Sequence, residues 1–61
     1  MTYAERVKKL RETLLITQQE LASLLNVSVV TVNRWENRKF EPTMKEKRKL
    51  AVLFKENRVG E

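Results

Sequence analysis

Three Thr-x-x-Glu patterns constrain the fold of this 61-residue chain more than any other feature of its sequence. In such a capping box, the Thr side chain accepts a hydrogen bond from a backbone N–H of the first helical turn, and the Glu side chain reaches back to the Thr backbone. Each pattern precedes an apolar stripe, so together they indicate three helix starts. The three pairs are Thr2 with Glu5, Thr17 with Glu20, and Thr43 with Glu46.

Apolar residues recur at three- and four-residue spacing after each start, which is typical of amphipathic helices that pack on a core. We therefore predict helices over about residues 3–13, 18–25 and 44–57. Pro42 precedes the last start, where a helix cannot yet have begun. The expected core-facing residues are Val7, Leu10 and Leu14 in the first helix, Leu21, Ala22 and Leu25 in the second, and Met44, Leu50, Ala51, Leu53 and Phe54 in the last.

The segment between the second and the last of these helices is rich in β-branched residues, and propensity alone favours a strand there. However, the chain offers no second strand, and a lone strand would leave its backbone groups unpaired. Ser28 is a good N-cap, and Val32 and Trp35 are three residues apart, as on one face of a helix. We therefore predict a short helix over residues 29–37, stabilised by tertiary packing. Because Asn26 tolerates a positive φ, a tight turn there completes a helix-turn-helix arrangement.

Charge and composition narrow the function classes. Lys and Arg number 13 against 8 Asp and Glu, which gives a net charge of +5 and a pI near 10.0 and favours a nucleic-acid partner. With no Cys and no His, the chain lacks disulfides, thiolate zinc sites and the commonest general base. Capping and helix surfaces account for Glu5, Glu12, Glu20 and Glu46. We therefore expect no enzyme activity, no catalytic residue, no cofactor and no metal site.

The sequence also carries expectations about location and control. No apolar run reaches the length of a membrane span, and the first residues lack the layout of a signal peptide. We therefore expect a cytoplasmic, nucleoid-associated protein without membrane contact. Nothing in the chain has the size of a sensing domain, so we expect no small-molecule effector.

A longer motif runs through the predicted helix-turn-helix. Residues 17–37 read Thr-Gln-x-Glu-Leu-Ala, a turn, Val-Ser, then x-x-Thr-Val-x-x-Trp-Glu-Asn, and Pro42 follows. This combination resembles the phage-repressor, or xenobiotic-response-element, helix-turn-helix family, over about residues 6–54. The resemblance implies an all-α, lambda-repressor-like bundle of four, or five, short helices, here as a single domain over residues 1–61. It also implies that the third helix lies in the major groove of DNA.

The third helix has an outward face that follows from its core-facing residues. At about 100° per residue, Val30 and Arg34 lie opposite Val32, and the outward positions match the base-reading positions of the family. Arg34 can bind guanine O6 and N7, Asn33 can read adenine, and valines can pack on thymine methyl groups. The simpler alternative is a solvated charge and an ordinary pair of exposed valines. The expected base-contacting residues are Val29, Val30, Asn33 and Arg34.

The resemblance also implies phosphate contacts around this helix. Gln18, at the N-terminus of the second helix, matches a family residue that touches a phosphate, and a helix N-terminus already favours an anion. The alternative is that Gln18 is an ordinary surface residue. The expected phosphate-contacting residues are Thr17, Gln18, Thr31, Asn37, Arg38, Lys39 and Lys45. We expect the neighbouring cluster to be a solvated face, formed by Lys47, Arg48 and Lys49.

Glu36 needs a structural explanation, because a carboxylate on a DNA-binding helix repels phosphate. In the family the matching Glu commonly pairs with an Arg of the first helix, and spacing from Gln18 identifies that partner as Arg11. We therefore expect an Arg11–Glu36 ion pair that braces the third helix and keeps the carboxylate away from DNA. If the pair is exposed, it contributes about 1 kcal/mol or less.

Two positions depart from the family pattern. Leu15 and Arg38 stand where the family often has Gly. Either the turn at Leu15 avoids a positive φ, or it carries strain of roughly 1–3 kcal/mol. We expect Phe40 to fill the core beneath the loop that contains Arg38.

We thus predict a sequence-specific regulator, a repressor, that binds double-stranded DNA as a homodimer on a two-fold operator, with half-sites about one helical turn apart. The alternative is a protein-interaction module of the same fold, such as an antitoxin or an adaptor. No tail suited to toxin neutralisation is present in the sequence, which disfavours that alternative. Because the chain ends soon after the fourth helix, we expect a dimer-forming fifth helix to be missing.

Overall fold

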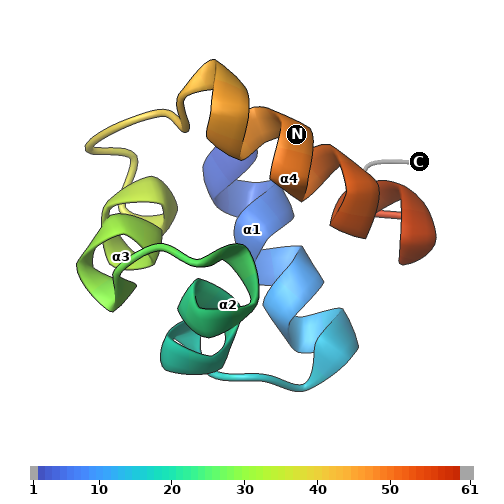
Figure 1. Cartoon of the computed structure of the whole chain (residues 1–61). Helices are drawn as coiled ribbons and strands as arrows, with labels where there is room; N and C mark the ends of the chain where they lie inside the picture. The colour runs from blue at the N-terminus through green and yellow to red at the C-terminus, as the bar shows by residue number, and fades with distance from the viewer. Residues whose placement is uncertain (1, 60–61) are drawn as a thin grey trace.

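The computed structural model describes residues 2–59 and consists of four α-helices, with no strand among those residues. The predicted all-α bundle is confirmed, and the helix ends differ from the predicted ends by at most one residue. Residues 1, 60 and 61 lie outside the described residues, so the predicted domain over 1–61 stays a prediction. The helices are α1 Tyr3–Leu14, α2 Gln18–Leu25, α3 Val29–Glu36 and α4 Met44–Glu56 (Figure 1).

Capping boxes start α1, α2 and α4 as predicted. In α2, the Glu20 amide donates to Thr17 Oγ1 at 3.1 Å, and the Thr17 amide donates to Glu20 Oε1 at 3.0 Å. In α1, the hydrogen bonds with Thr2 hold the pKa of the Glu5 carboxyl below its usual value. α3 begins with Ser28 as its N-cap and without a capping box. Ser28 Oγ accepts a hydrogen bond from the Thr31 amide at 3.2 Å. The helix starts are therefore set by local side-chain chemistry.

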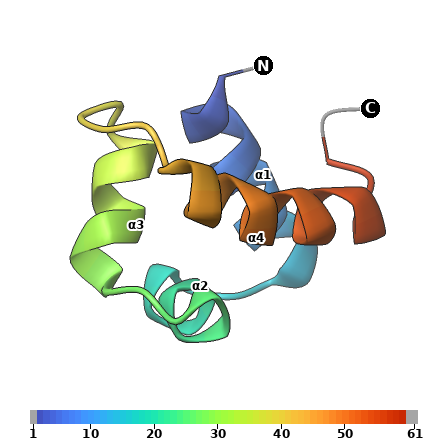
Figure 2. The ribbon, with the colours of Figure 1, turned by 45° about the horizontal axis from the view of Figure 1, so that its top comes forward.

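The core lies where the four helices meet. α3 packs against α1 and α2, and α4 crosses over α1 and also contacts α2 (Figures 1 and 2). The segment with ambiguous propensity is a helix because its Val32 and Trp35 are buried against this core. The largest fully buried side chains are Leu10, Leu21, Leu50, Val7 and Val32.

The apolar face of α4 differs from the predicted stripe. Leu50 and Phe54 are buried, but Met44 is 67% exposed and Ala51 is also exposed. The reason is helical geometry, because residues one and six positions away from Leu50 lie about 100–120° from it around the helix. Val59, beyond the end of α4, is buried and closes that end of the core.

Three turns before α4 place residues other than glycine in the left-handed region. Asn26 ends α2 with a φ of 56°, which confirms the predicted tight turn. Leu15 ends α1 with a φ of 57°, and Arg38 follows α3 with a φ of 60°. The turn at Leu15 therefore does not avoid a positive φ, and the left-handed conformation costs a residue of this kind about 1–2 kcal/mol.

The loop between α3 and α4 does not insert Phe40 into the core. Phe40 is 61% exposed, so the expectation that it fills the core is wrong. The Lys39 amide donates to the Arg34 carbonyl at 3.0 Å, and the chain turns at this point. The loop residues that follow are exposed until the chain reaches the buried Pro42. Phe40 is thus left on the surface beside α3.

Candidate nucleic-acid interface

α3 has an exposed outer face. Val30 is 52% exposed, and Asn33 and Arg34 are also exposed. Val29 and Thr31 are half-buried, and Val29 packs in part against the core. Both ribbon views show α3 at the edge of the molecule, with none of the other described helices over its outer side (Figures 1 and 2). The side chains most available to a partner on this face are therefore Val30, Asn33 and Arg34.

Arg11 of α1 and Glu36 of α3 form a two-pronged ion pair. Arg11 Nε donates to Glu36 Oε2 at 2.6 Å, and Arg11 Nη2 donates to Glu36 Oε1 at 2.7 Å. Glu36 is 4% exposed, and its hydrogen bonds raise the pKa of the Arg11 guanidinium above the ordinary value. Arg11 Nη1 also donates to the Ile16 carbonyl at 3.4 Å. The pair thus ties α3 to α1 and holds the carboxylate away from the outer face.

A chain of side-chain amides, which sequence reasoning missed, runs from Glu36 to the outer face. Gln18 Nε2 donates to Glu36 Oε1 at 3.2 Å, and Asn33 Nδ2 donates to Gln18 Oε1 at 3.4 Å. Asn37 Nδ2 in turn donates to Asn33 Oδ1 at 3.0 Å. Because an ionised carboxylate only accepts, Glu36 sets the direction of each donor in this chain. The signal in the sequence is the four-residue spacing of Asn33 and Asn37 on one side of the helix.

The amide chain occupies hydrogen-bonding groups of two residues that were expected to contact DNA, Asn33 and Gln18. The Nδ2 and Oδ1 atoms of the Asn33 side chain each already have a partner, so a two-bond contact with adenine competes with these bonds. The Gln18 side chain is half-buried and likewise held between Glu36 and Asn33. Thr17 caps α2 with its hydroxyl, and the first-turn N–H groups that have no partner within the helix are the kind of donor that an anion can accept from.

Arg34 lies beside Phe40 on the other side of the outer face. Its Cζ is 5.4 Å from the centroid of the Phe40 ring, which is within the range of a cation–π contact. Within residues 2–59, Arg34 takes part in no ion pair. The guanidinium therefore sits on an aromatic ring with N–H donors open to an external acceptor.

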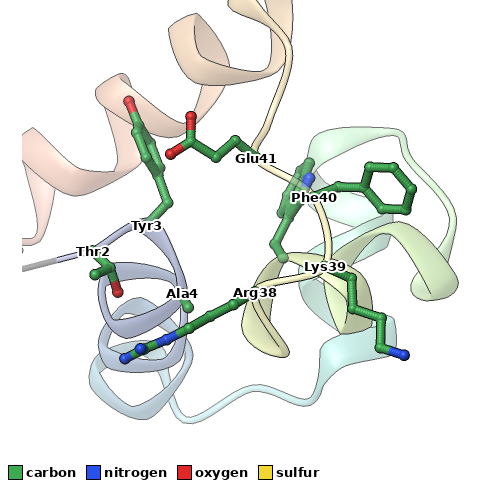
Figure 3. Close-up of a pocket in the computed structure, with 8 residues that line it drawn as sticks. Thr2, Tyr3, Ala4, Arg38, Lys39, Phe40 and Glu41 are labelled. Carbon is green, nitrogen blue, oxygen red and sulfur yellow. The ribbon is translucent and has the colours of Figure 1, made fainter.

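The loop after α3 sends its two cations in different directions. Arg38 extends toward α1, with Nη2 at 3.6 Å from the Glu5 carboxylate, whereas Lys39 points away from α1 (Figure 3). The Arg38–Glu5 pair is exposed and contributes little to stability. Lys39 is exposed and has no ion pair within the described residues. Asn37, also exposed, is bonded back to α3.

The order of these elements is a helix, a tight turn and a second helix with a braced inner face and an exposed outer face. A model of the helix-turn-helix family matches residues 7–58. The chain belongs to this helix-turn-helix family. The match includes both helices of the motif, α2 and α3, and confirms the phage-repressor, or xenobiotic-response-element, type. Comparisons with curated proteins and with solved structures found no match. Helix-turn-helix domains of this family bind DNA, and the family is not typically enzymatic.

Basic residues of α4 in this helix-turn-helix domain differ in their surroundings. Lys45 is exposed in the first turn. Lys49 Nζ donates to the Leu25 carbonyl at 2.9 Å and so caps the end of α2, where helix carbonyls lack internal partners. Lys47 Nζ lies 5.1 Å from the centroid of the Tyr3 ring, at the start of α1. The expected solvated face is therefore wrong for Lys47 and Lys49, and only Arg48 of that cluster is exposed.

Among residues 2–59, no cluster of three or more acidic, His or Cys side chains is placed to hold a metal ion. None of the helices in that part of the chain combines the length and apolar character needed to cross a bilayer.

Proposed function

We propose that this domain is a sequence-specific transcriptional regulator, a repressor, that places α3 in the major groove of double-stranded DNA. The observation that supports this most is Arg34, an exposed guanidinium without an ion pair in residues 2–59, on a helix whose inner face is buried. An arginine that binds guanine O6 and N7 is the commonest specific contact in the major groove. Val30, exposed beside it, supplies an apolar contact for a thymine methyl group.

We rank the other two base-contacting residues below Arg34 and Val30. Val29 offers only the exposed part of a half-buried side chain. Asn33 reads adenine once it exchanges its hydrogen bonds to Gln18 and Asn37 for bonds to the base. Base readout therefore centres on Arg34 and Val30.

Phosphate contacts are proposed on both sides of α3, because α2 and the loop before α4 flank it (Figure 1). On the first side, the N-terminus of α2 offers the Thr17 hydroxyl and the first-turn N–H groups that begin with Gln18. On the second side, the contacts come from the loop, from α4 and from the half-buried side of α3. Arg38 joins this second set when its exposed pair with Glu5 opens. The proposed residues of the second side are Thr31, Asn37, Arg38, Lys39 and Lys45.

We propose that two copies bind a two-fold operator. The folded part measures 25 × 20 × 19 Å, and half-sites one helical turn apart are separated by about 34 Å. Two copies therefore fit side by side on one face of the duplex. Two bound copies would repress transcription by excluding other proteins from DNA that overlaps the operator. Because its proposed partner is DNA, we also propose that the protein is associated with the nucleoid.

Selection of bound sequences from random duplex DNA at two salt concentrations tests this function. We expect an enriched two-fold motif and an affinity that falls with salt, because binding releases the counterions of the phosphates. Arg34→Ala should lose one base preference, whereas Arg48→Ala, at an exposed arginine of α4, should keep the motif. If no sequence is enriched and binding does not depend on salt, the proposed function is wrong and a protein-interaction module is favoured.

A further inference from the structure

We propose that Phe40 is a positioning residue for Arg34, and that its ring determines how strictly guanine is preferred at the base pair that Arg34 reads. The inference rests on the proposed function, because it concerns the same contact with DNA. Phe40 is the only exposed aromatic side chain in residues 2–59. Its ring buries little apolar area in the core, so stability of the fold does not explain why an aromatic residue stands there.

The backbone on both sides of Phe40 is fixed. The Arg38 amide donates to the Trp35 carbonyl at 3.2 Å. The Lys39 amide donates to the Arg34 carbonyl at 3.0 Å. Beyond the ring, Pro42 is buried and has a restricted φ. The ring is therefore tied to the last turn of α3, which is the turn that carries Arg34.

The contact suits an arginine that reads a base. The Arg34 Cζ lies 5.4 Å from the centroid of the Phe40 ring. A guanidinium over an aromatic face keeps its in-plane N–H donors free, and these donors are the groups that meet guanine O6 and N7. A fully solvated arginine side chain populates many rotamers, and ordering it on binding reduces affinity. The ring therefore orders part of the Arg34 side chain before DNA arrives.

The neighbouring carboxylates have other partners. Glu41 and Glu46 line the same hollow as Arg34 and Phe40. The Glu41 carboxylate lies 3.6 Å from Lys47 Nζ, and Glu46 Oε1 accepts the amide of the α4 N-cap at 2.8 Å. Neither acid forms an ion pair with Arg34. The Arg34 guanidinium is therefore positioned mainly by its contact with the Phe40 ring.

The contact itself can be tested without DNA. In the wild-type protein, the ring current of Phe40 should shift the δ protons of Arg34 upfield in NMR spectra. Phe40→Leu should return these protons to the values of a solvated arginine, and the variant should unfold at the wild-type temperature because the ring is exposed. Identical Arg34 shifts in the two proteins would overturn the proposal.

A double-mutant cycle tests the positioning role on DNA. For the selected site, we expect Phe40→Leu to weaken binding about two- to fivefold and to reduce the preference for guanine at the Arg34 base pair. In the Arg34→Ala background, the same change should have no effect. Phe40→Trp keeps an aromatic face and should retain the preference. Val52→Ala truncates another exposed apolar side chain, in the second half of α4, and serves as the matched control.

The outcomes separate the proposal from the function on which it rests. If Phe40→Leu weakens binding to every sequence equally, and does so also without Arg34, Phe40 touches DNA directly and the positioning role is rejected. A motif that Phe40→Leu leaves unchanged rejects that role while the proposed function stands. If the wild-type protein enriches no sequence, the proposed function fails and the positioning role fails with it.

Discussion

Arg11 and Glu36 join α1 to α3 through two hydrogen bonds, at 2.6 and 2.7 Å, around a carboxylate that is 4% exposed. The helix that carries the outer face is therefore fixed to the first helix by a charge pair as well as by apolar packing. The pair also keeps a negative charge off the surface that we propose meets phosphate.

Arg11→Met should destabilise the domain by about 2–4 kcal/mol, because it leaves the buried Glu36 carboxylate without its charged partner. Urea unfolding measures this loss. The double variant Arg11→Met/Glu36→Leu should recover most of it, since no uncompensated charge is then buried. A single variant as stable as the wild type would mean that the pair contributes nothing to folding.

Lys39→Ala should weaken binding to all duplexes alike and reduce the slope of log affinity against log salt by about one. Lys39 is exposed on the loop beside α3 and has no ion pair within residues 2–59. Arg34→Ala should instead cost about 1–3 kcal/mol on the selected site and relax one base position. Titration of labelled duplexes at several salt concentrations measures both effects. If Lys39→Ala altered the motif and Arg34→Ala did not, the two roles would have to be exchanged.

Leu15→Gly should stabilise the domain by about 0.5–1 kcal/mol, because Gly adopts a positive φ without steric cost. Leu15 has a φ of 57° and is 89% exposed, so its removal sacrifices little packing. Leu15→Ala is the matched control, since it removes most of the side chain but keeps Cβ, and it should leave stability nearly unchanged. Thermal unfolding should show a higher midpoint for Leu15→Gly alone, and a lower one would mean that the turn is not strained.

Lys49→Met should destabilise the end of α2 by about 1 kcal/mol, because it removes the hydrogen bond from Lys49 Nζ to the Leu25 carbonyl at 2.9 Å. Arg48→Met, at the exposed neighbouring position, should have almost no effect. Urea unfolding gives the overall loss, and amide hydrogen exchange in the last turn of α2 locates it. Equal stability of the two variants would indicate that the cap does not contribute.

Most of the fold can be predicted from signals that act within a few residues. The Thr17–Glu20 box is complete within one turn of helix, so α2 begins where the motif places it. The buried pair Val32 and Trp35 is enough to orient α3, and it explains why a β-branched segment is helical. The Arg11–Glu36 pairing was expected only through the family resemblance, because nothing local connects residues 25 positions apart.

The sequence by itself determined where the helices begin, which face of α3 turns inward and which family the chain resembles. Only the tertiary structure decided which side chains meet between helices. In the folded protein, Asn33 donates a hydrogen bond to Gln18, and Lys49 caps the C-terminal end of α2. Phe40 lies outside the core, beside Arg34. The physical reason is one of range. Capping and amphipathic spacing act over three or four residues, whereas these contacts depend on how helix ends and loops approach one another once the core has formed.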